Sequence, residues 1–203
     1  ALDNAYWDYS AKSVNSRVWK LIGLSAPKNV VTAETIGVDT QENMAKEARR
    51  LKNAPLIKVK LNNKNVISSV VAVRENAPQA RIIVDPNEGW SFYELEQFSP
   101  ILKDLNIEMI EQPVPAKDDF CLLEYDCPVD ICADESCHTL ADLPKLIGKY
   151  QMINIKLDKS GGISAAIELE REARAAGFKI MIGCMIGTSL SMAPATLIAH
   201  NAD

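Results

Sequence analysis

The chain has 203 residues, of which 47% are hydrophobic, 24% charged and 6% aromatic, so it can bury one sizeable core and is not a disordered tail. It carries 22 Lys and Arg residues against 27 Asp and Glu residues, a formal net charge of −5. This balance gives no overall positive field, which argues against nucleic acid and an anionic membrane surface as partners.

The predicted elements begin with a helical pattern over residues 1–23. From there to the end, short apolar runs alternate with longer helical patterns. The predicted strands are Val30–Ile36, Leu56–Leu61, Arg81–Val84, Ile107–Ile110, Val129–Ala133, Met152–Leu157 and Lys179–Cys184. The predicted helices are Thr40–Lys52, Asn63–Asn76, Ser91–Leu105, a short one near Asp118–Tyr125, Thr139–Tyr150, Gly162–Ala176 and Ser189–Asn201. Asp39-Thr40 and Ser91 are suitable N-caps, and Gly177 is a suitable C-terminal stop.

These elements make seven strand-then-helix units, the pattern of a parallel α/β protein. The strands are mostly continuously apolar, as expected when helices cover both faces of a parallel sheet. The chain holds neither G-x-G-x-x-G nor G-x-x-x-x-G-K-[ST], which disfavours a doubly wound nucleotide-binding sheet. We therefore predict a (β/α)8-type TIM barrel that is incomplete, over residues 30–203. Residues 1–29 are predicted to be a helical segment linking to a further domain.

Cysteine and histidine usage limits the chemistry further. The five cysteines form no C-x-x-C pair and lie in or beside apolar runs, which argues against disulfides or structural zinc and favours the cytoplasm. Only His138 and His200 are available for a histidine-dependent nucleophile. The uncharged run Ile180–Ala199 is long enough to span a membrane, but Gly187-Thr188-Ser189 interrupts it. We expect a strand, a turn and a helix there, and no membrane partner.

The active site of a barrel of parallel strands lies at the C-terminal ends of the strands. Charged residues gather at these predicted ends: Lys58 and Lys60 on the second strand, Asp85 on the third, Glu111 on the fourth, Asp134 on the fifth and Lys156 on the sixth. Because strand side chains alternate between faces, Lys58 and Lys60 are expected to point the same way.

Asp85, Glu111 and Asp134 are expected to arrive from consecutive strands at one level. Any one of them could instead cap the helix that follows it. Three in register, flanked by lysines, favour a metal site. Oxygen ligands with no Cys or His beside them favour Mg²⁺, with Mn²⁺ as the alternative.

Lys60 and Lys156 are expected on opposite sides of this cluster, because the second and sixth strands face each other across a barrel. That arrangement suits removing a proton from one face of a carbon and returning one to the other. A lysine acting as a base near neutral pH needs a pKa well below its ordinary value of about 10.4. A divalent cation and Lys58 would lower that pKa, whereas the carboxylates would raise it.

Six short motifs follow one another in order: Ile57-Lys58-Val59-Lys60, Val84-Asp85-Pro86-Asn87, Ile110-Glu111-Gln112-Pro113, Ala133-Asp134-Glu135-Ser136, Asn154-Ile155-Lys156-Leu157-Asp158-Lys159-Ser160-Gly161-Gly162 and Ile182-Gly183-Cys184-Met185-Ile186. With the opening Ala1-Leu2-Asp3-Asn4-Ala5-Tyr6-Trp7-Asp8, they span nearly the whole chain. In kind and order they resemble the enolase superfamily, its muconate-cycloisomerase subgroup and, within that, the dipeptide epimerases.

The resemblance implies roles for these residues. Asp85, Glu111 and Asp134 would bind Mg²⁺, to which the substrate carboxylate would also coordinate. Lys60 and Lys156 would be the acid/base pair acting on the carbon next to that carboxylate, through an enediolate stabilised by the metal.

The same resemblance implies that Lys58 helps to hold the substrate carboxylate and that Asn87 and Glu135 support the site from behind. The enzyme would be an isomerase, a Mg²⁺-dependent epimerase of dipeptides of the L-Ala-D/L-Glu type. Its partner would be a small-molecule substrate, a dipeptide or an N-acyl amino acid, and we expect a homo-oligomer.

Three departures of this sequence from the family's pattern keep alternatives for the reaction open. Gly187 stands where many relatives carry an acidic residue. The family's capping domain is expected before Ala1 and its eighth strand after Asp203, and both hold contacts that select the substrate. An N-acylamino acid racemase, an o-succinylbenzoate synthase and a muconate cycloisomerase therefore remain alternatives, as does a catalytically inert fragment of such an enzyme.

Overall fold

The structure, a computed structural model, describes all 203 residues and divides into two compact units. One unit comprises Val31–Ser136 with Gly148–Gln151. The other comprises Ala1–Val30, Cys137–Ile147 and Met152–Asp203. Seven strands form, as predicted, and within each unit every strand pair is parallel. The predicted α/β class is confirmed.

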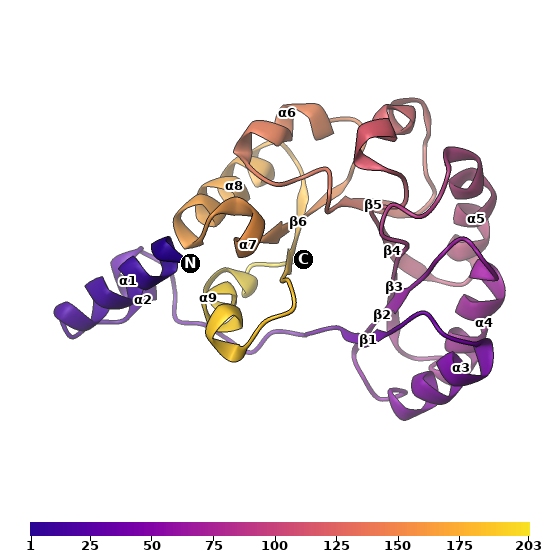
Figure 1. Cartoon of the computed structure of the whole chain (residues 1–203), viewed down its shortest axis with the longest axis horizontal. Coiled ribbons are helices and arrows are strands. Elements are labelled where there is room, and N and C mark those ends of the chain that lie inside the picture. The colour runs from indigo at the N-terminus through magenta and orange to yellow at the C-terminus, as the bar shows by residue number, and fades with distance from the viewer. The chain divides into compact units, whose positions relative to one another are not determined.

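The first of these units holds five strands in which neighbours in the chain are neighbours in the sheet. They are β1 (Glu34–Ile36), β2 (Leu56–Lys60), β3 (Arg81–Asp85), β4 (Ile107–Glu111) and β5 (Asp130–Ala133). Its helices are α3 (Gln41–Arg50), α4 (Val66–Asn76), α5 (Phe92–Asp104) and the 3-10 helix η1 (Ala116–Glu124). Figure 1 shows α3, α4 and α5 side by side along one side of β1 to β4.

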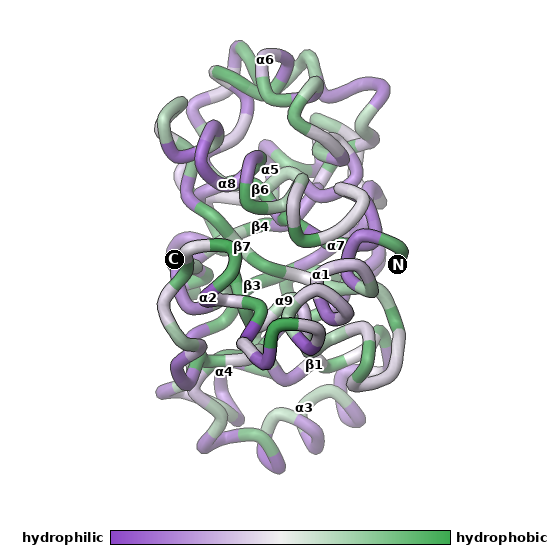
Figure 2. The backbone as a smooth tube through the Cα atoms, turned by 90° about the vertical axis from the view of Figure 1, so that its left-hand side faces the viewer, coloured by the Kyte–Doolittle hydropathy of each residue, from purple (hydrophilic) through white to green (hydrophobic).

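The core of this unit lies between the sheet and these helices. On β2, Ile57 and Val59 are fully buried, whereas Lys58 and Lys60 lie on the opposite face. α3 buries only Met44 and Ala48, and its tube alternates between hydrophilic and hydrophobic colours in Figure 2. β2 thus has one apolar face toward the helices and one face that carries its two lysines.

Local capping begins the helices as the sequence predicts. The Thr40 hydroxyl accepts a hydrogen bond from the backbone N–H of Asn43. Ser91 and Glu94 form a capping box at the start of α5. Both caps satisfy N–H groups that have no partner inside the helix.

The second unit pairs β6 (Met152–Lys156) with β7 (Lys179–Gly183). Its helices are α1 (Leu2–Ser13), α2 (Val18–Leu21), the 3-10 helix η2 (Leu140–Asp142), α6 (Leu143–Leu146), α7 (Leu157–Ser160), α8 (Ile163–Ala175) and α9 (Ser189–Ala199). Gly162 precedes α8 and offers no capping side chain, so α1 caps it: the N–H groups of Ile163 and Ser164 donate to Asn4 and Asp3 over 3.0 Å each. Gly177, with φ +90°, follows the end of α8, as predicted.

The largest differences from the predicted elements lie in two places. The strand predicted over Val30–Ile36 pairs only from Glu34 onward. The register aligns Glu34 with Ile57 near the start of β2, so the preceding residues have no ladder to join, and Val30 and Val31 are exposed. The helix predicted over Thr139–Tyr150 breaks into η2 and α6, since Pro144 lacks an N–H and Gly148 turns the chain with φ +82°.

The opening helical segment is also divided, because Asn15 adopts φ +49° between α1 and α2. The uncharged run Ile180–Ala199 is shared between β7 and α9, as predicted. None of the helices combines the length and the apolar character needed to cross a membrane.

Candidate active site

The two lysines of β2 lie against buried carboxylates from the next two strands. Lys58 Nζ is 2.5 Å from Oε2 of Glu111 and 2.8 Å from Oδ2 of Asp85. Lys60 Nζ is 2.6 Å from the same Asp85 oxygen, and Lys60 is the register partner of Asp85. Asp85 and Glu111 are both fully buried. Adjacent parallel strands thus bring two ammonium groups and two carboxylates to one edge of the sheet.

The loop after β3 extends this cluster. Asn87 Oδ1 accepts a hydrogen bond from Lys60 Nζ at 2.6 Å, and its backbone N–H donates to Asp85 Oδ1 at 2.9 Å. Its side-chain amide donates to Glu135 Oε1 at 3.3 Å. Asn87 has φ +46°, a left-handed conformation that Asn tolerates better than most residues. Asn87 therefore joins Lys60, Asp85 and Glu135.

Burial and charge act together on these groups. Burial raises the pKa of Glu111, and Lys58 opposes that shift. Burial lowers the pKa of Lys58, but Glu111 and Asp85 outweigh it, so this pKa lies above its ordinary value. Burial, followed by the charge of Asp134, raises the pKa of Glu135. In this arrangement the two carboxylates therefore favour the protonated, positively charged form of Lys58.

Asp134 follows β5 and is 2% exposed. Its backbone N–H donates to the side-chain oxygen of Gln112, which follows Glu111. The carboxylates at the ends of β3, β4 and β5 thus all belong to one unit, at neighbouring strand ends.

These residues suit a divalent cation by their donor chemistry. The donors are buried carboxylate oxygens, and Oε2 of Glu135 is a further buried oxygen without a hydrogen-bond partner. As the side chains are arranged, no group of three His, Cys, Asp or Glu residues is positioned to hold one ion, and Lys58 bridges Asp85 and Glu111. A cation at this edge would take over the charge compensation that Lys58 provides.

Lys156 belongs to the other unit. It is the last residue of β6, is partly exposed, and is aligned in register with Gly183 of β7. Asp158, two residues later, accepts a hydrogen bond from the Met185 N–H at 3.3 Å, which joins the segments that follow β6 and β7. Of the predicted site residues, Lys58, Lys60, Asp85, Asn87, Glu111 and Glu135 are connected by direct contacts in one cluster.

Gln112 is the residue that the sequence reasoning missed. It is fully buried, has φ +36°, and its side-chain oxygen accepts hydrogen bonds from the backbone N–H groups of Asp134 and Ser136. Its place directly after Glu111 was the available signal, but the contacts it makes come from segments up to 38 residues away.

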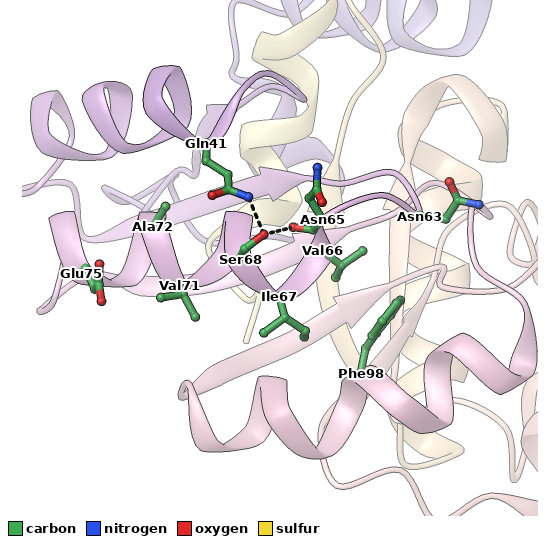
Figure 3. A pocket seen from close by; sticks show the side chains of 10 residues that line it. All are labelled: Gln41, Asn63, Asn65, Val66, Ile67, Ser68, Val71, Ala72, Glu75 and Phe98. Atoms are coloured by element: carbon green, nitrogen blue, oxygen red, sulfur yellow. Dashed lines mark hydrogen bonds between the residues drawn. The ribbon is translucent and has the colours of Figure 1, made fainter.

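A broad groove lies elsewhere in the same unit, over α4 (Figure 3). On one side of the groove, Gln41 of α3 donates a hydrogen bond to Ser68 of α4 at 2.5 Å, and Phe98 of α5 lines the other side. None of the predicted site residues lines this groove.

Comparison with known proteins agrees with the sequence motifs. The family model described as "Enolase C-terminal domain-like" matches residues 43–202. The chain is 44% identical over 202 residues to the N-acetyl-D-glutamate racemase of Pseudoalteromonas sp, and 45% identical over 197 residues to the L-Ala-D/L-Glu epimerase of Escherichia coli. It covers 64% and 61% of these two proteins, and they cover 100% and 96% of the chain.

Solved structures give the same result. A structure titled L-Ala-D/L-Glu Epimerase superposes with a TM-score of 0.95 and 43% identity, covering 100% of this chain and 64% of that one. A dipeptide epimerase from Enterococcus faecalis, complexed with Mg and the dipeptide L-Leu-L-Tyr, gives a TM-score of 0.91 at 30% identity, covering 100% of this chain and 60% of that one. The predicted fold, an incomplete barrel-type α/β domain, is confirmed as part of these longer structures. The chain belongs to the enolase C-terminal domain-like family, and so to the enolase superfamily.

Proposed function

We propose that the protein containing this chain is a metal-dependent epimerase or racemase that inverts the carbon next to a free carboxylate. The observation that carries the proposal is the cluster in which Lys58 and Lys60 contact Asp85 and Glu111 at the ends of β2, β3 and β4. Relatives at 44–45% identity carry racemase and epimerase names, which supports the reaction class. Since the chain spans 64% and 61% of their lengths, the activity is proposed for the whole protein.

In this proposal Asp85, Glu111 and Asp134 hold a divalent cation, Mg²⁺ or alternatively Mn²⁺. Buried carboxylates are ligands that both ions accept. When bound, the cation supplies positive charge that stabilises the negative charge developing on the substrate carboxylate. The Mg in the Enterococcus faecalis structure supports this assignment.

Lys60 acts as one acid/base group and Lys156 as the other. A neutral lysine takes the proton from one face of the carbon, so the C–H bond breaks and an N–H bond forms. The electron pair left behind is delocalised into the carboxylate. The second lysine, as an ammonium ion, donates a proton to the opposite face, and the configuration inverts.

The neighbouring side chains bind the substrate carboxylate and orient the amine of Lys60. Lys58, held as a cation by Glu111 and Asp85, contributes positive charge for the substrate carboxylate. Asn87 fixes the amine of Lys60 by accepting from its Nζ at 2.6 Å. Glu135 holds the Asn87 amide in turn.

Two substrate classes share the features that this chemistry needs. A dipeptide and an N-acetylated amino acid both present a free α-carboxylate next to an acylated nitrogen. They differ in the free ammonium group, which only the dipeptide carries. The two most similar relatives reported above carry one name of each kind, so the dipeptide is the first proposal and N-acetylglutamate the second.

Proton exchange in deuterated water tests both proposed substrate classes. With Mg²⁺ present, we expect the intact protein to exchange the α-proton of the glutamate residue in L-Ala-L-Glu, seen by NMR as loss of that signal and growth of the second diastereomer. Exchange of N-acetyl-D-glutamate and not of the dipeptide would select the second proposal. Absence of exchange by the intact protein in a panel of L-Ala-X dipeptides, N-acyl amino acids and the substrates of the cycloisomerase and synthase alternatives would overturn the enzymatic proposal. Exchange by the intact protein but not by residues 1–203 alone would select the inert-fragment alternative for this chain.

We also propose that residues 1–29 link the barrel residues 30–203 to a further domain. On α1, Leu2, Tyr6 and Tyr9 are 88%, 64% and 73% exposed, which is unusual for large apolar side chains along one helix. We propose the cytoplasm as the location, consistent with the five cysteines being free thiols, and a homo-oligomer as the assembly.

A further inference from the structure

We infer that Gln112 is a positioning residue that fixes the relative placement of Glu111 and Asp134, and that a buried cluster of Ser136, Tyr150, Asp119 and Lys149 holds it. This inference rests on the proposed function, because it assigns Glu111 and Asp134 as cation ligands. It goes beyond that function by giving a role to a residue that has no part in the proposed cation binding or proton transfer.

The backbone of Gln112 is held on both sides. Its N–H donates to the Cys132 carbonyl and its carbonyl accepts from the Glu88 N–H, each over 2.8 Å. Its φ of +36° lies in the left-handed region, which disfavours residues with a side chain such as Gln. Such a conformation persists only where the surroundings enforce it, and it lies directly after Glu111.

The side-chain oxygen of Gln112 fixes the backbone around the second ligand. Oε1 accepts from the N–H of Asp134 at 2.9 Å and from the N–H of Ser136 at 3.0 Å. One atom therefore holds the chain on both sides of Glu135. Because Gln112 follows Glu111 directly, this oxygen joins the end of β4 to the segment after β5 that carries Asp134.

The side-chain nitrogen anchors the same amide. Nε2 lies 3.0 Å from each of three acceptors: the Val114 carbonyl, the Ser136 hydroxyl and the Tyr150 hydroxyl. The oxygen meets only donors, and the nitrogen meets a carbonyl and two hydroxyls. The orientation of the amide is therefore determined by its surroundings.

The two hydroxyl groups that contact the Gln112 amide are in turn bonded to a buried ion pair, Asp119 with Lys149. The Tyr150 hydroxyl donates to Asp119 Oδ2 at 2.9 Å, and the Ser136 hydroxyl donates to the same oxygen at 2.8 Å. Lys149 Nζ is 2.5 Å from the other Asp119 oxygen, and both side chains are about one-tenth exposed. The pair thus fixes the two hydroxyls that contact Gln112.

This geometry distinguishes positioning from packing. An apolar side chain of the same length would fill the space of Gln112 but leave the N–H groups of Asp134 and Ser136 without their acceptor. The segment carrying Asp134 would then be free to shift relative to Glu111. The expected consequence is weaker binding of the cation. A substitution that only lowers the stability of the fold would leave this affinity unchanged.

The test measures binding of Mn²⁺ alone, by the electron paramagnetic resonance signal of the free ion, to the intact protein and three variants. We expect Gln112→Met to weaken Mn²⁺ binding by about tenfold or more, as removal of a group supporting a metal ligand does. Tyr150→Phe, which deletes only one hydroxyl, should weaken it several-fold. Leu102→Ala removes a fully buried side chain of α5 in the same unit and should lower stability without changing the affinity.

Unchanged Mn²⁺ affinity in Gln112→Met, or an equal loss in Leu102→Ala, would overturn the inference. If Gln112→Met does not fold, Tyr150→Phe decides: a several-fold loss supports the inference and an unchanged affinity overturns it. A wild-type protein that does not bind Mn²⁺ also overturns it.

Proton exchange on the same samples separates this inference from the proposed function. Variants that lose Mn²⁺ affinity in a protein that exchanges no substrate proton would retain the inference and reject the function. If the wild-type protein exchanges the substrate proton but the variants bind Mn²⁺ as tightly as the wild type, the proposed function is retained and the inference is rejected.

Discussion

The ammonium group of Lys58 lies 2.5 Å from a carboxylate oxygen of Glu111, and the two side chains are 13% and 0% exposed. The same ammonium contacts Asp85 at 2.8 Å. A buried carboxylate costs free energy unless an opposite charge is close to it, and here one cation compensates two carboxylates.

Removing this cation should destabilise the protein in the absence of metal. We expect Lys58→Met to lower the free energy of unfolding by about 3–5 kcal/mol, since it leaves buried charges uncompensated. Added Mg²⁺ should restore more stability to the variant than to the wild type, because the ion replaces the lost charge. Urea denaturation with and without Mg²⁺ measures both effects.

The matched control is Lys12→Met, which removes an exposed lysine paired with Asp8 on α1. It should leave stability nearly unchanged, since exposed ion pairs contribute little. Equal effects of the two substitutions would contradict the role given to Lys58.

The two proposed acid/base lysines should be separable by stereochemistry. Lys60→Met and Lys156→Met should each lower kcat for epimerisation by about 100-fold or more. Each variant should still exchange the α-proton of the one diastereomer that the remaining lysine deprotonates. The two variants should therefore show opposite preferences when L-Ala-L-Glu and L-Ala-D-Glu are compared by NMR in deuterated water.

A loss of exchange from the same diastereomer in both variants would argue against two lysines acting on opposite faces. Lys103→Met, on the last turn of α5, provides a variant of the same type away from the cluster. Its exchange should match that of the wild type.

The cap at η2 should make part of the stability dependent on pH. Asp142 accepts hydrogen bonds from the N–H groups of His138 and Thr139 at 3.1 and 2.9 Å. Partial burial raises the pKa of Asp142, but these hydrogen bonds outweigh it, so the pKa lies below its ordinary value of 3.8. A depressed pKa in the folded state means that the carboxylate stabilises the fold above about pH 4 and that this contribution is lost as the pH falls through the folded-state pKa.

Asp142→Asn should therefore cost about 1 kcal/mol at pH 7 and progressively less below pH 4. Urea midpoints of the two proteins, measured between pH 7 and pH 3, give this difference directly. A difference that stays constant or grows as the pH falls would contradict the assignment.

The contact between α1 and α8 should depend on Asp3. Its carboxylate accepts from the Ser164 N–H at 3.0 Å and from the Ser164 hydroxyl at 2.7 Å. Asp3→Ala should cost about 1 kcal/mol, the usual effect of losing a helix cap, and should speed amide hydrogen exchange in the first turn of α8. Asp8→Ala, whose side chain pairs only within α1, is the control and should leave that exchange unchanged.

Gly162 gives a second way to disturb this contact. A Cβ atom there would lie 2.5 Å from Asp3 Oδ2, and φ is +137°. Gly162→Ala should therefore reproduce the faster exchange of Asp3→Ala. If it leaves exchange in α8 unchanged, the close approach of α1 is not what protects this helix end.

Features that depend on nearby residues could be predicted from the sequence. The apolar runs gave the strands, and the Thr40 and Ser91 caps lie three residues or fewer from the groups they satisfy. The convergence of Lys60 and Asp85 was also predictable, because parallel strands must end at one edge of the sheet. What the pattern could not give was the length of the first strand, because it depends on where its partner β2 begins.

The sequence by itself determined the strand-then-helix order and the charges at the strand ends, because both follow from periodicity along the chain. Only the tertiary structure decided that Lys58 bridges Glu111 and Asp85, and that Gln112 joins the backbone at Asp134 to Tyr150. These contacts join residues 22 to 53 positions apart in the chain. Their partners are chosen by the packing of whole strands and loops, since a buried amide or ammonium must find its hydrogen bonds wherever the fold places them.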